Sequence, residues 1–544
     1  MRSTFMGLEA SKRGLYTQQS ALYTTGHNIA NANTDGYSRQ RVNMQATPGY
    51  PGVGLNAPTV PGFIGTGVEA GSVQRVRDQF IDKQFRQETN KLGYWQSRSQ
   101  AIEQLEDILN EPSEFGLQQS LSLFWQSLQD LSVHPENGGA RAVVIDRGMA
   151  VAESFNYMNT SMKEIQQNLR HEIEVSISEV NSILDQIAAL NKQIVEVEPN
   201  GYMPNDLYDA RDVLLDELSE VFPLDLEYTK SGGRALASAE GVVTVSLRIG
   251  KESMMLVDGI ERVHVQANYE KSNEKYREGL EPFQSLSVSK MTSIAEPIER
   301  KEDGSLQTVQ QTAQYAQLPS TGKFAGIVDS YGYLEDGRQK GLYPEQLDAL
   351  DRLAQAFAKA FNEQHAEGVA KNKLSSTEVA SFFTTKEAPD SDTVSWETIT
   401  AENIQVNEKI QKDSSLLRAA SNNSKDGEEG NGANAKALAD VQHRILLEGV
   451  DNGGLNGASV QTFLEGIIGE LGVLGQQAKR NTFNAETMAE SIEYRRASVM
   501  SVSLDEEMTD MIRFQQAYNA SARMITAVDE TLDKIINGMG RVGL

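Results

Sequence analysis

Residues 504–532, LDEEMTDMIRFQQAYNASARMITAVDETL, set the plan of this 544-residue chain. Every seventh position in this stretch carries a large side chain: Leu504, Met511, Tyr518, Ile525 and Leu532. A second repeat with the same spacing lies near the start of the chain: Leu8, Leu15, Leu22 and Ile29. A heptad stripe is typical of a helix that packs lengthwise on another helix. We therefore expect the two ends of the chain to pair as coiled-coil helices and to pack against further copies of the chain.

The first of these helices, expected over 4–31, is weak on its own. It contains Gly7, Gly14 and Gly26, and each glycine costs about 1 kcal/mol relative to alanine. Such a helix depends on partners for its order. It ends in a segment of residues that tolerate or prefer left-handed backbone, which includes Asn31, Asn33 and Gly36. We expect the turn from Asn31 to Tyr37 to fix the angle between this helix and the next domain.

Composition narrows the class of protein. The formal net charge of −26 argues against nucleic acid or an anionic membrane surface as the main partner. The chain has no cysteine, which excludes disulfides, thiol catalysis and thiolate metal sites. No apolar run approaches the roughly 20 residues of a membrane span, and residues 1–30 lack the pattern of a signal peptide. We expect a cytosolic protein, or one exported by a route that recognises another signal.

The region after the first 70 residues is mostly helical in pattern. The clearest pattern spans 158–197, where apolar residues recur at steps of three and four over 40 residues, or about 60 Å of helix. Asn205 or Asp206 is a candidate cap for a further helix. Helices are also expected over 74–110, 117–132, 344–365, 434–448, 457–497 and 503–537. These segments predict a helical bundle in the middle of the molecule.

The period changes from helical to alternating after Pro223. Val243, Val245, Leu247 and Ile249 alternate with polar residues, which predicts a half-buried strand. Asp258-Gly259 between two apolar runs predicts a hairpin. We expect an antiparallel β domain over 224–335, a weaker β-like or mixed segment over 371–420, and a loop or linker over 421–434.

The expected fold class is α+β and mainly helical. Paired terminal coiled-coil helices form one domain, a helical bundle forms the middle domain, and an antiparallel β domain is inserted. The expected boundaries are 1–45 with 500–544 for the terminal domain, 46–223, 338–370 and 434–499 for the helical domain, and 224–337 with 371–433 for the β-rich outer domain and linker.

The sequence offers no constellation for catalysis. The six histidines lack the paired spacing of a metal motif, and no P-loop or nucleophile elbow is present. The GxGxxA match at 65–70 follows a Pro/Gly-rich loop and predicts a turn entering a strand. The acidic residues 505–507 suit the start of a helix, where the dipole favours anions. We expect no catalytic residue, no cofactor and no metal ion.

A small basic–aromatic cluster has two interpretations of equal weight. Arg39 and Arg41 lie beside Tyr37. The cluster is either part of a solvated hairpin or a subunit contact with an acidic neighbour.

Both ends of the chain resemble known signatures. Residues 28–39, NIANANTDGYSR, and residues 503–520, SLDEEMTDMIRFQQAYNA, resemble the two terminal signatures of the bacterial flagellar rod, hook and hook-associated proteins. Residues 205–212, NDLYDARD, and 361–365, FNEQH, are similar to the hook-associated protein 1 family of hook–filament junction proteins. The resemblance covers nearly the whole chain and is weakest at about 265–320.

The resemblance implies a structural subunit and not an enzyme. Such a protein is exported through the flagellar type III pathway without a cleaved signal, and it joins the hook to the filament outside the cell as a junction layer. The implied partners are other copies, hook protein, the second junction protein (hook-associated protein 3) and an export chaperone on the C-terminal helix, with neither nucleic acid nor membrane insertion. The expected subunit-interface residues are Leu8, Leu15, Leu22, Ile29, Asn31, Asn33, Gly36, Tyr37, Arg39, Leu504, Met508, Met511, Gln515, Tyr518, Ile525 and Leu532.

Three alternatives carry different expectations. A hook or distal rod subunit would look mostly β between its termini, against the long helix expected at 158–197. An enzyme carried on the flagellum, such as a peptidoglycan hydrolase or a protease, would require an active-site constellation in the middle of the chain. A surface adhesin would bind host or matrix through residues 224–335.

Overall fold

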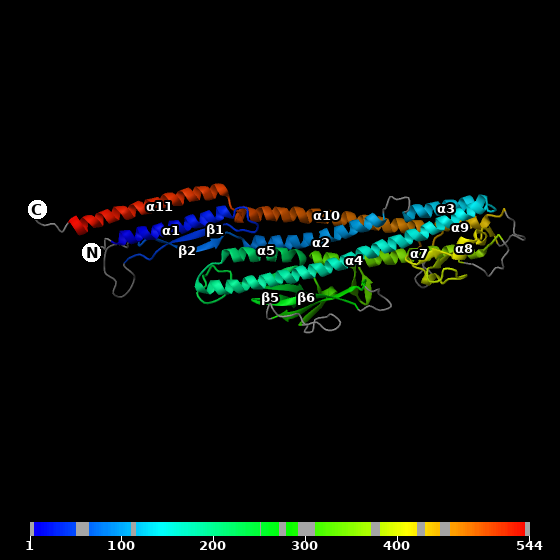
Figure 1. Ribbon diagram of the computed structural model, residues 1–544, viewed down its shortest axis with the longest axis horizontal. Coiled ribbons are helices and arrows are strands. Elements are labelled where there is room, and N and C mark those ends of the chain that lie inside the picture. Colours follow the sequence, from blue (N-terminus) through cyan, green and yellow to red (C-terminus); the bar gives the residue numbers. More distant parts are fainter. Residues whose placement is uncertain are drawn as a thin grey trace.

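The computed structural model describes residues 5–50, 65–109, 116–250, 252–270, 279–291, 310–371, 381–421, 430–446 and 457–538. The molecule is elongated, with long helices running along it and a β-sheet on one side (Figure 1). Both termini lie at the same end, where one helix pair projects beyond the rest of the body. The expected fold class, mainly helical with paired terminal helices and an inserted sheet, is confirmed.

The projecting part consists of two helices and a hairpin, which we call the terminal unit. Helix α1 (Phe5–Ala30) packs on α11 (Leu504–Asp533), which ends in a π-helical turn, Lys534–Gly538. Strands β1 (Gln40–Ala46) and β2 (Val68–Arg75) form an antiparallel hairpin beside α1. The strand expected after the GxGxxA match is therefore confirmed. Much of the expected Gly/Pro-rich loop, residues 51–64, lies outside the described residues.

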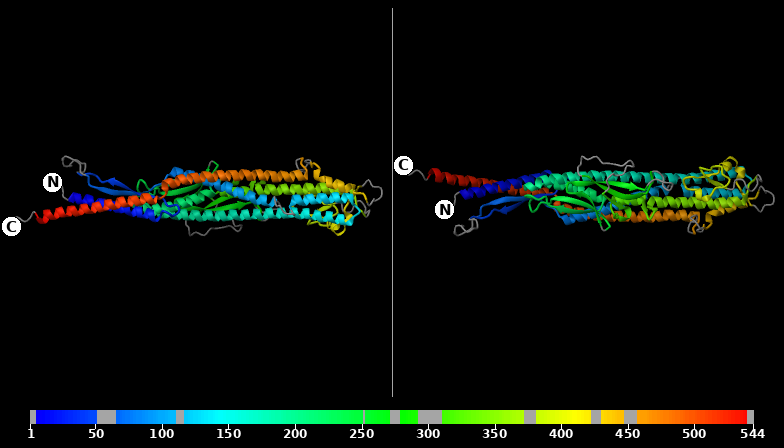
Figure 2. Two further views of the ribbon diagram at one scale, coloured as in Figure 1. Left: turned by 90° about the horizontal axis from the view of Figure 1, so that it is seen from above. Right: turned by 90° about the horizontal axis from the view of Figure 1, so that it is seen from below.

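The middle of the molecule is a helical bundle (Figure 2). Its long helices are α2 (Gln79–Leu109), α3 (Leu117–Val133), α4 (Gly138–Val197), α5 (Asn205–Val221), α7 (Leu342–Glu367) and α10 (Val460–Met500), with the shorter α6 (Lys323–Tyr331) and α9 (Ala433–Asp440). The described residues also contain five short 3-10 turns, at Glu198–Asn200, Tyr315–Gln317, Trp396–Thr398, Ser414–Leu416 and Val441–His443. Helix α4 has 60 residues, about 90 Å.

Three helix predictions need correction. Helix α4 begins 20 residues before the expected 158, because Asn137 caps it by accepting the N–H of Gly139. The helix expected over 434–448 ends at Asp440 and gives way to a 3-10 turn, while 447–448 lie outside the described residues. Neither Asn205 nor Asp206 caps α5. Asn205 is the first helical residue and donates to Gln40 Oε1 and to the carbonyl of Val73 instead.

The inserted sheet has eight strands among the described residues. They are β3 (Leu224–Thr229), β4 (Val242–Ile249), β5 (Glu252–Asp258), β6 (Glu261–Tyr269), β7 (Phe283–Met291), β8 (Gln311–Gln314), β9 (Tyr333–Glu335) and β10 (Arg338–Lys340). The alternation in β4 is confirmed, with Val243, Val245 and Leu247 fully buried. The hairpin between β5 and β6 is also confirmed, and Gly259 there has φ of 62°.

The expected antiparallel domain over 224–335 needs one correction. Strand β9 runs parallel to β7, and helix α6 separates β8 from β9. Seven of the nine residues of α6 are buried, and the helix packs on α2. The sheet is attached to α4 through two asparagines. Asn181 bonds the backbone of Val265 at 2.9 and 2.8 Å, and Asn191 bonds that of Val243 at 2.9 and 3.3 Å.

The end of the molecule far from the termini has an aromatic core. Its buried rings are Phe124, Phe155, Phe357, Phe361, Phe382 and Phe383. Short elements surround it: β11 (Gly368–Val369), β12 (Phe383–Thr385), β13 (Ile404–Val406), α8 (Glu408–Lys412) and β14 (Ala420–Ser421). The mixed segment expected over 371–420 is confirmed where it is described, and residues 422–429 of the expected linker lie outside the described residues.

Candidate assembly site at the terminal helices

The terminal helices run antiparallel and approach closely through small residues. A Cβ added to Gly7 would lie 3.7 Å from Cγ2 of Val528, and one added to Gly14 would lie 3.2 Å from Oγ of Ser521. At the other end of the pair, Nδ2 of Asn28 donates to Glu507 Oε2 at 3.1 Å. The contact line on α1 therefore falls one residue before the leucine stripe.

The leucine stripe lies beside this contact line. Leu8, Leu15, Leu22 and Ile29 are half-buried, and the buried residues of α1 are Thr17, Ala21, Thr24, Thr25 and Asn28. On α11, Met511, Tyr518 and Ile525 of the expected stripe are half-buried and Leu532 is buried. Leu504, Met508 and Gln515 are exposed. The structure thus leaves part of each stripe open.

Large apolar side chains line the outer faces of both helices. On α1 these are Phe5, Tyr16 and Tyr23, which are 58, 57 and 80% exposed. On α11 they are Leu504, Met508, Ile512 and Met524, which are 50–56% exposed. Exposed large apolar side chains gathered on one unit of a protein are typical of a binding surface.

The turn after α1 is tied together by Asn28. Its Oδ1 accepts the N–H of Gln40 at 3.0 Å and the hydroxyl of Tyr37 at 2.8 Å. Burial, together with nearby carboxylates, raises the pKa of Tyr37, so this hydroxyl stays a donor. Gly36 has φ of 72°, and a Cβ there would lie 2.1 Å from Cγ2 of Val213 on α5. Only glycine fits this approach of the turn to the bundle.

The remaining turn residues have local roles. Asn31 donates through Nδ2 to the carbonyl of His27 at 3.0 Å, at the end of α1. Asn33 is exposed. Neither side chain has a described contact that reaches α11 or the bundle.

Arg39, in the basic–aromatic cluster, pairs with acidic residues of its own chain. Its guanidinium bonds Glu506 at 2.6 Å and Glu507 at 2.7 Å, and the backbone N–H of Arg39 donates to the carbonyl of Met500 at 2.9 Å. The acidic neighbour therefore lies in the same chain. The contact spans the break between α10 and α11. Glu507 is only 2% exposed. Besides its favourable interaction with the dipole of α11, it therefore forms a buried ion pair with Arg39.

A buried group of ten charges lies where the terminal unit meets the bundle, and we call it the joint cluster. Its members are Arg75, Arg77, Arg86, Arg211, Arg496, Asp82, Asp209, Asp212, Asp216 and Glu240. None of these side chains is more than 21% exposed. The five cations and five anions balance, which a buried ionic group requires.

Asp212 is at the centre of the joint cluster. It lies 2.9 Å from Arg75, 2.9 Å from Arg77 and 3.3 Å from Arg86. Burial alone would raise the pKa of this carboxyl, but the surrounding guanidinium groups hold its pKa well below the usual range. Burial raises the pKa of Asp209, which Arg75 and the N–H of Ser38 offset only in part. Asp209 is therefore the first of the two to take up a proton on acidification.

The sequence did not indicate the joint cluster. Asp209, Asp212 and Asp216 recur at steps of three and four on α5, a spacing that places them on one helix face. Such a face is ordinarily solvated. Three arginines at 75, 77 and 86 could have been matched with these three aspartates as ion-pair partners. The sequence, however, does not show that the two segments lie close together in the fold.

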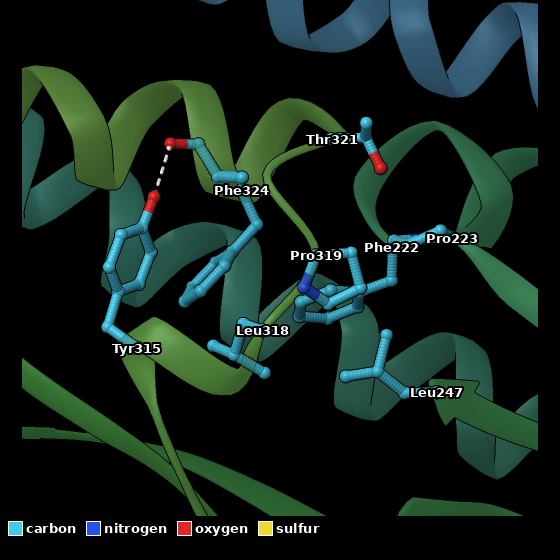
Figure 3. Close-up of a pocket in the computed structure, with 9 residues that line it drawn as sticks. Phe222, Pro223, Leu247, Tyr315, Leu318, Pro319, Thr321 and Phe324 are labelled. Carbon is cyan, nitrogen blue, oxygen red and sulfur yellow. Dashed lines mark hydrogen bonds between the residues drawn. The ribbon is translucent and has the colours of Figure 1, made fainter. Parts of the chain in front are cut away.

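One cavity among the described residues lies between β4 and α6. Figure 3 shows a cavity of about 10 Å³ whose lining includes Phe222, Leu247 and Phe324, enough for about one water molecule. Tyr315 at its edge donates to the carbonyl of Ala325 at 3.3 Å. Nowhere in the described ranges do three or more His, Asp or Glu side chains gather as metal ligands. None of the described helices is long and apolar enough to span a membrane.

Three family models match separate parts of the chain. The flagellar hook-associated protein FlgK helical domain matches residues 102–383, more than half of the chain. The flagella basal body rod protein model matches residues 8–37, and the flagellar basal body rod FlgEFG protein C-terminal model matches residues 499–538. The last two cover the terminal helices whose pairing is described above.

Whole-chain relatives agree with these models. The flagellar hook-associated protein 1 of Bacillus subtilis is 42% identical over 99% of both chains, and that of Salmonella typhimurium is 24% identical over 96% of this chain and 98% of its own. The flagellar hook junction protein FlgK from Burkholderia pseudomallei shares the fold, with a TM-score of 0.55 at 12% identity, over 77% of this chain and all of that one. This chain therefore belongs to the flagellar hook-associated protein 1 family, the structural, non-enzymatic proteins of the extracellular hook–filament junction of the bacterial flagellum.

Proposed function

We propose that this chain joins the hook to the filament as an adaptor layer and that its copies polymerise through the terminal unit. The supporting observation is the open apolar surface on α1 and α11. Of the 30 residues of α11, only Glu507 and Leu532 are buried. A helix with so little buried surface in one chain gains most of its stability from neighbours.

The interface proposed here combines two sets of residues. The half-buried positions of the heptad stripes, such as Leu15 and Ile525, form the margins of the α1·α11 contact. The exposed residues on either side, such as Tyr23 and Met508, extend that apolar surface outward. Neighbouring copies would cover both sets together.

The chain's position in the flagellum implies further partners. Hook protein would lie on one side of the junction layer and the second junction protein, hook-associated protein 3, on the other. Before export through the type III pathway, a chaperone would cover the apolar face of α11, where Leu504, Met508 and Ile512 are exposed. In this arrangement the terminal unit forms the inner tube, the bundle the middle and the sheet the outer surface.

Hydrogen exchange tests the proposal directly. The purified monomer is compared with the same protein added to isolated hooks. We expect fast exchange in α1 and α11 of the monomer, strong protection of both helices on hooks, and unchanged protection in α4 as the internal control. Equal exchange of α1 and α11 in the two states, or no binding to hooks, would contradict polymerisation through the terminal unit.

A matched pair of variants tests the surface itself. Met508→Asp places a charge on the open face of α11, where Met508 is 56% exposed. Val473→Asp is the control, since Val473 is 65% exposed on α10 of the bundle. We expect the first variant to lose addition to hooks and the second to retain it. Retention by both would remove α11 from the interface.

A further inference from the structure

The terminal unit joins the bundle through a narrow connection. Two short chain segments link them: residues 76–78 between β2 and α2, and residues 501–503 between α10 and α11. Helix α1 packs on α11 and on the hairpin rather than on the bundle helices. The direction of the projecting pair therefore depends on contacts at one end of it (Figure 1).

Small errors of angle at this end are amplified along the pair. Helix α11 has 30 residues, about 45 Å. A rotation of about 10° at the joint would move its far end by about 8 Å, which is close to the distance between the axes of packed helices. Copies can pack through the terminal unit in one register only if the joint holds the pair to within a few degrees.

The contacts across the joint are directional. The N–H of Ser38 donates to Asp209 Oδ2 at 3.1 Å, and Nε2 of Gln40 donates to Asp206 Oδ1 at 2.9 Å. Arg75, the last residue of the hairpin, bonds Asp209 at 2.7 Å and Asp212 at 2.9 Å. Charge-assisted hydrogen bonds of this kind fix orientation, whereas apolar contact is non-directional.

The same carboxylates also bind the helices on the other side of the joint. Asp212 bonds Arg77 at the entry to α2, and Asp216 bonds Arg86 of α2 at 2.6 Å and Arg496 of α10. One face of α5 thus holds the hairpin, α2 and α10 at once. Because Arg75 of the hairpin pairs only with carboxylates of this cluster, turning the hairpin would leave buried charges unpaired, which is strongly unfavourable.

We propose that the joint cluster sets the direction of the terminal helix pair, so that Arg75, Arg77 and Asp212 are positioning residues for assembly. They act through the hairpin and have no part in the contact between copies. This inference rests on the proposed polymerisation through the terminal unit. It assigns the control of helix direction to buried charges as well as to the turn at 31–37.

The test measures the angle in the full-length chain, without hooks. The chain has no cysteine, so introduced cysteines take spin labels at chosen sites only. Gln193→Cys on α4 and Asp529→Cys on α11 are both at exposed positions and span the joint. Pulsed electron resonance then gives the distribution of label distances. We expect one narrow distribution in the parent chain and at least a twofold broader one in Asp212→Asn.

Controls separate positioning from general loosening. Labels at Gln193→Cys and Gln476→Cys lie on two bundle helices at exposed positions and should keep their distribution in Asp212→Asn. Arg248→Gln breaks an exposed arginine–aspartate pair with Asp225, 2.8 Å long, and should leave the joint distribution unchanged. If Asp212→Asn fails to fold, the double variant Arg77→Gln/Asp212→Asn removes one charge of each sign and takes its place.

The outcomes are distinguishable from those for the proposed function. A broadened joint distribution with an unchanged bundle distribution, and at least a tenfold loss of addition to hooks, supports the proposal. An unchanged joint distribution in a folded variant overturns it. A parent chain that does not add to hooks overturns polymerisation through the terminal unit, whereas the distance measurement still tests the joint.

Discussion

The pairs α2·α10 and α1·α11 share one plan but differ in how they are held. Each pairs a segment from the first fifth of the chain, antiparallel, with a segment from the last fifth. Helix α10 has nine buried residues among 41, including Leu464, Leu471 and Ile492, whereas α11 has two among 30. The bundle pair closes around an apolar core, whereas the terminal pair approaches through Gly7 and Gly14 of α1, opposite Val528 and Ser521 of α11. The same topology thus gives one pair whose apolar residues are buried within a single chain and one pair whose apolar residues stay largely exposed.

The largest contrast is expected between a core ring of the bundle and an exposed ring of the terminal pair. Phe361 is fully buried and contacts four other phenylalanines, so Phe361→Ala should lower the free energy of unfolding by about 3–5 kcal/mol. Tyr23 is 80% exposed, and Tyr23→Ala should change it by no more than about 0.5 kcal/mol. Urea denaturation of the monomer measures the change in unfolding free energy for both variants. Similar losses of stability in the two variants would contradict the distinction between the bundle core and the exposed terminal pair.

The second contrast concerns the joint cluster and its pH dependence. Asp212→Asn leaves buried arginines without a full partner and should cost about 3 kcal/mol at neutral pH. The pKa of Asp212 is lower in the folded chain than the value of about 3.9 in the unfolded chain. Its contribution is therefore fully present above about pH 4 and is lost as the pH falls through the folded pKa.

Denaturation of the parent chain and Asp212→Asn between pH 7 and pH 2.5 measures this effect. The difference between them should narrow on the acid side of about pH 4. Asp225→Asn is the control, since Asp225 pairs with Arg248 at an exposed site and the control should show a difference of at most about 1 kcal/mol. A difference for Asp212→Asn that stays constant across the range would contradict the assignment of the low pKa.

A smaller effect is expected from strengthening α1. The Cβ added by Gly7→Ala would meet Val528 at an ordinary contact distance of 3.7 Å, so the change should stabilise the helix by about 1 kcal/mol. Slower hydrogen exchange in α1 would show it. Gly26→Ala, where a Cβ meets nothing within 4 Å, is the control for helix propensity without a contact to α11. Unchanged exchange in both variants would show that glycine does not limit the order of α1.

The smallest effect on the monomer is expected from Leu15→Ala. Leu15 is half-buried on a helix that packs on α11 and the hairpin, so the unfolding free energy of the bundle should change by less than about 0.5 kcal/mol. Addition to hooks should nevertheless fall, because the variant removes part of the proposed surface. Co-sedimentation with hooks measures this, and a destabilised bundle with normal hook binding would reverse the roles given to the two pairs.

The period of the terminal helices could be predicted from the sequence, but their contact line could not. Leu8 and Leu15 give the correct spacing, yet α1 approaches α11 through Gly7 and Gly14, one position earlier. An apolar pattern marks the largest side chains, whereas two helices approach most closely where the side chains are smallest. On α11 the residues opposite these glycines are Val528 and Ser521, which also lie outside the expected stripe.

The remaining misses have two physical causes, one local and one that depends on distant segments. The start of α4 was missed because Gly138, Gly139 and Gly148 weaken the helical pattern there. Arg39 and Glu507 are 468 residues apart, so no local pattern connects them. Charged side chains at helical spacing on α5 were indistinguishable from a solvated face, because burial is decided by segments that arrive from elsewhere in the chain.

The pairing of the first helix with the last also has a consequence in time. Asn28 is bonded to Glu507, 479 residues further along the chain. At a synthesis rate of about 5–20 residues per second, α1 leaves the ribosome roughly 25 to 100 seconds before its partner exists. Helix α2 likewise leaves the ribosome long before its partner α10 has been synthesised. The terminal pair of this protein therefore cannot close until the final tenth of the chain has been made.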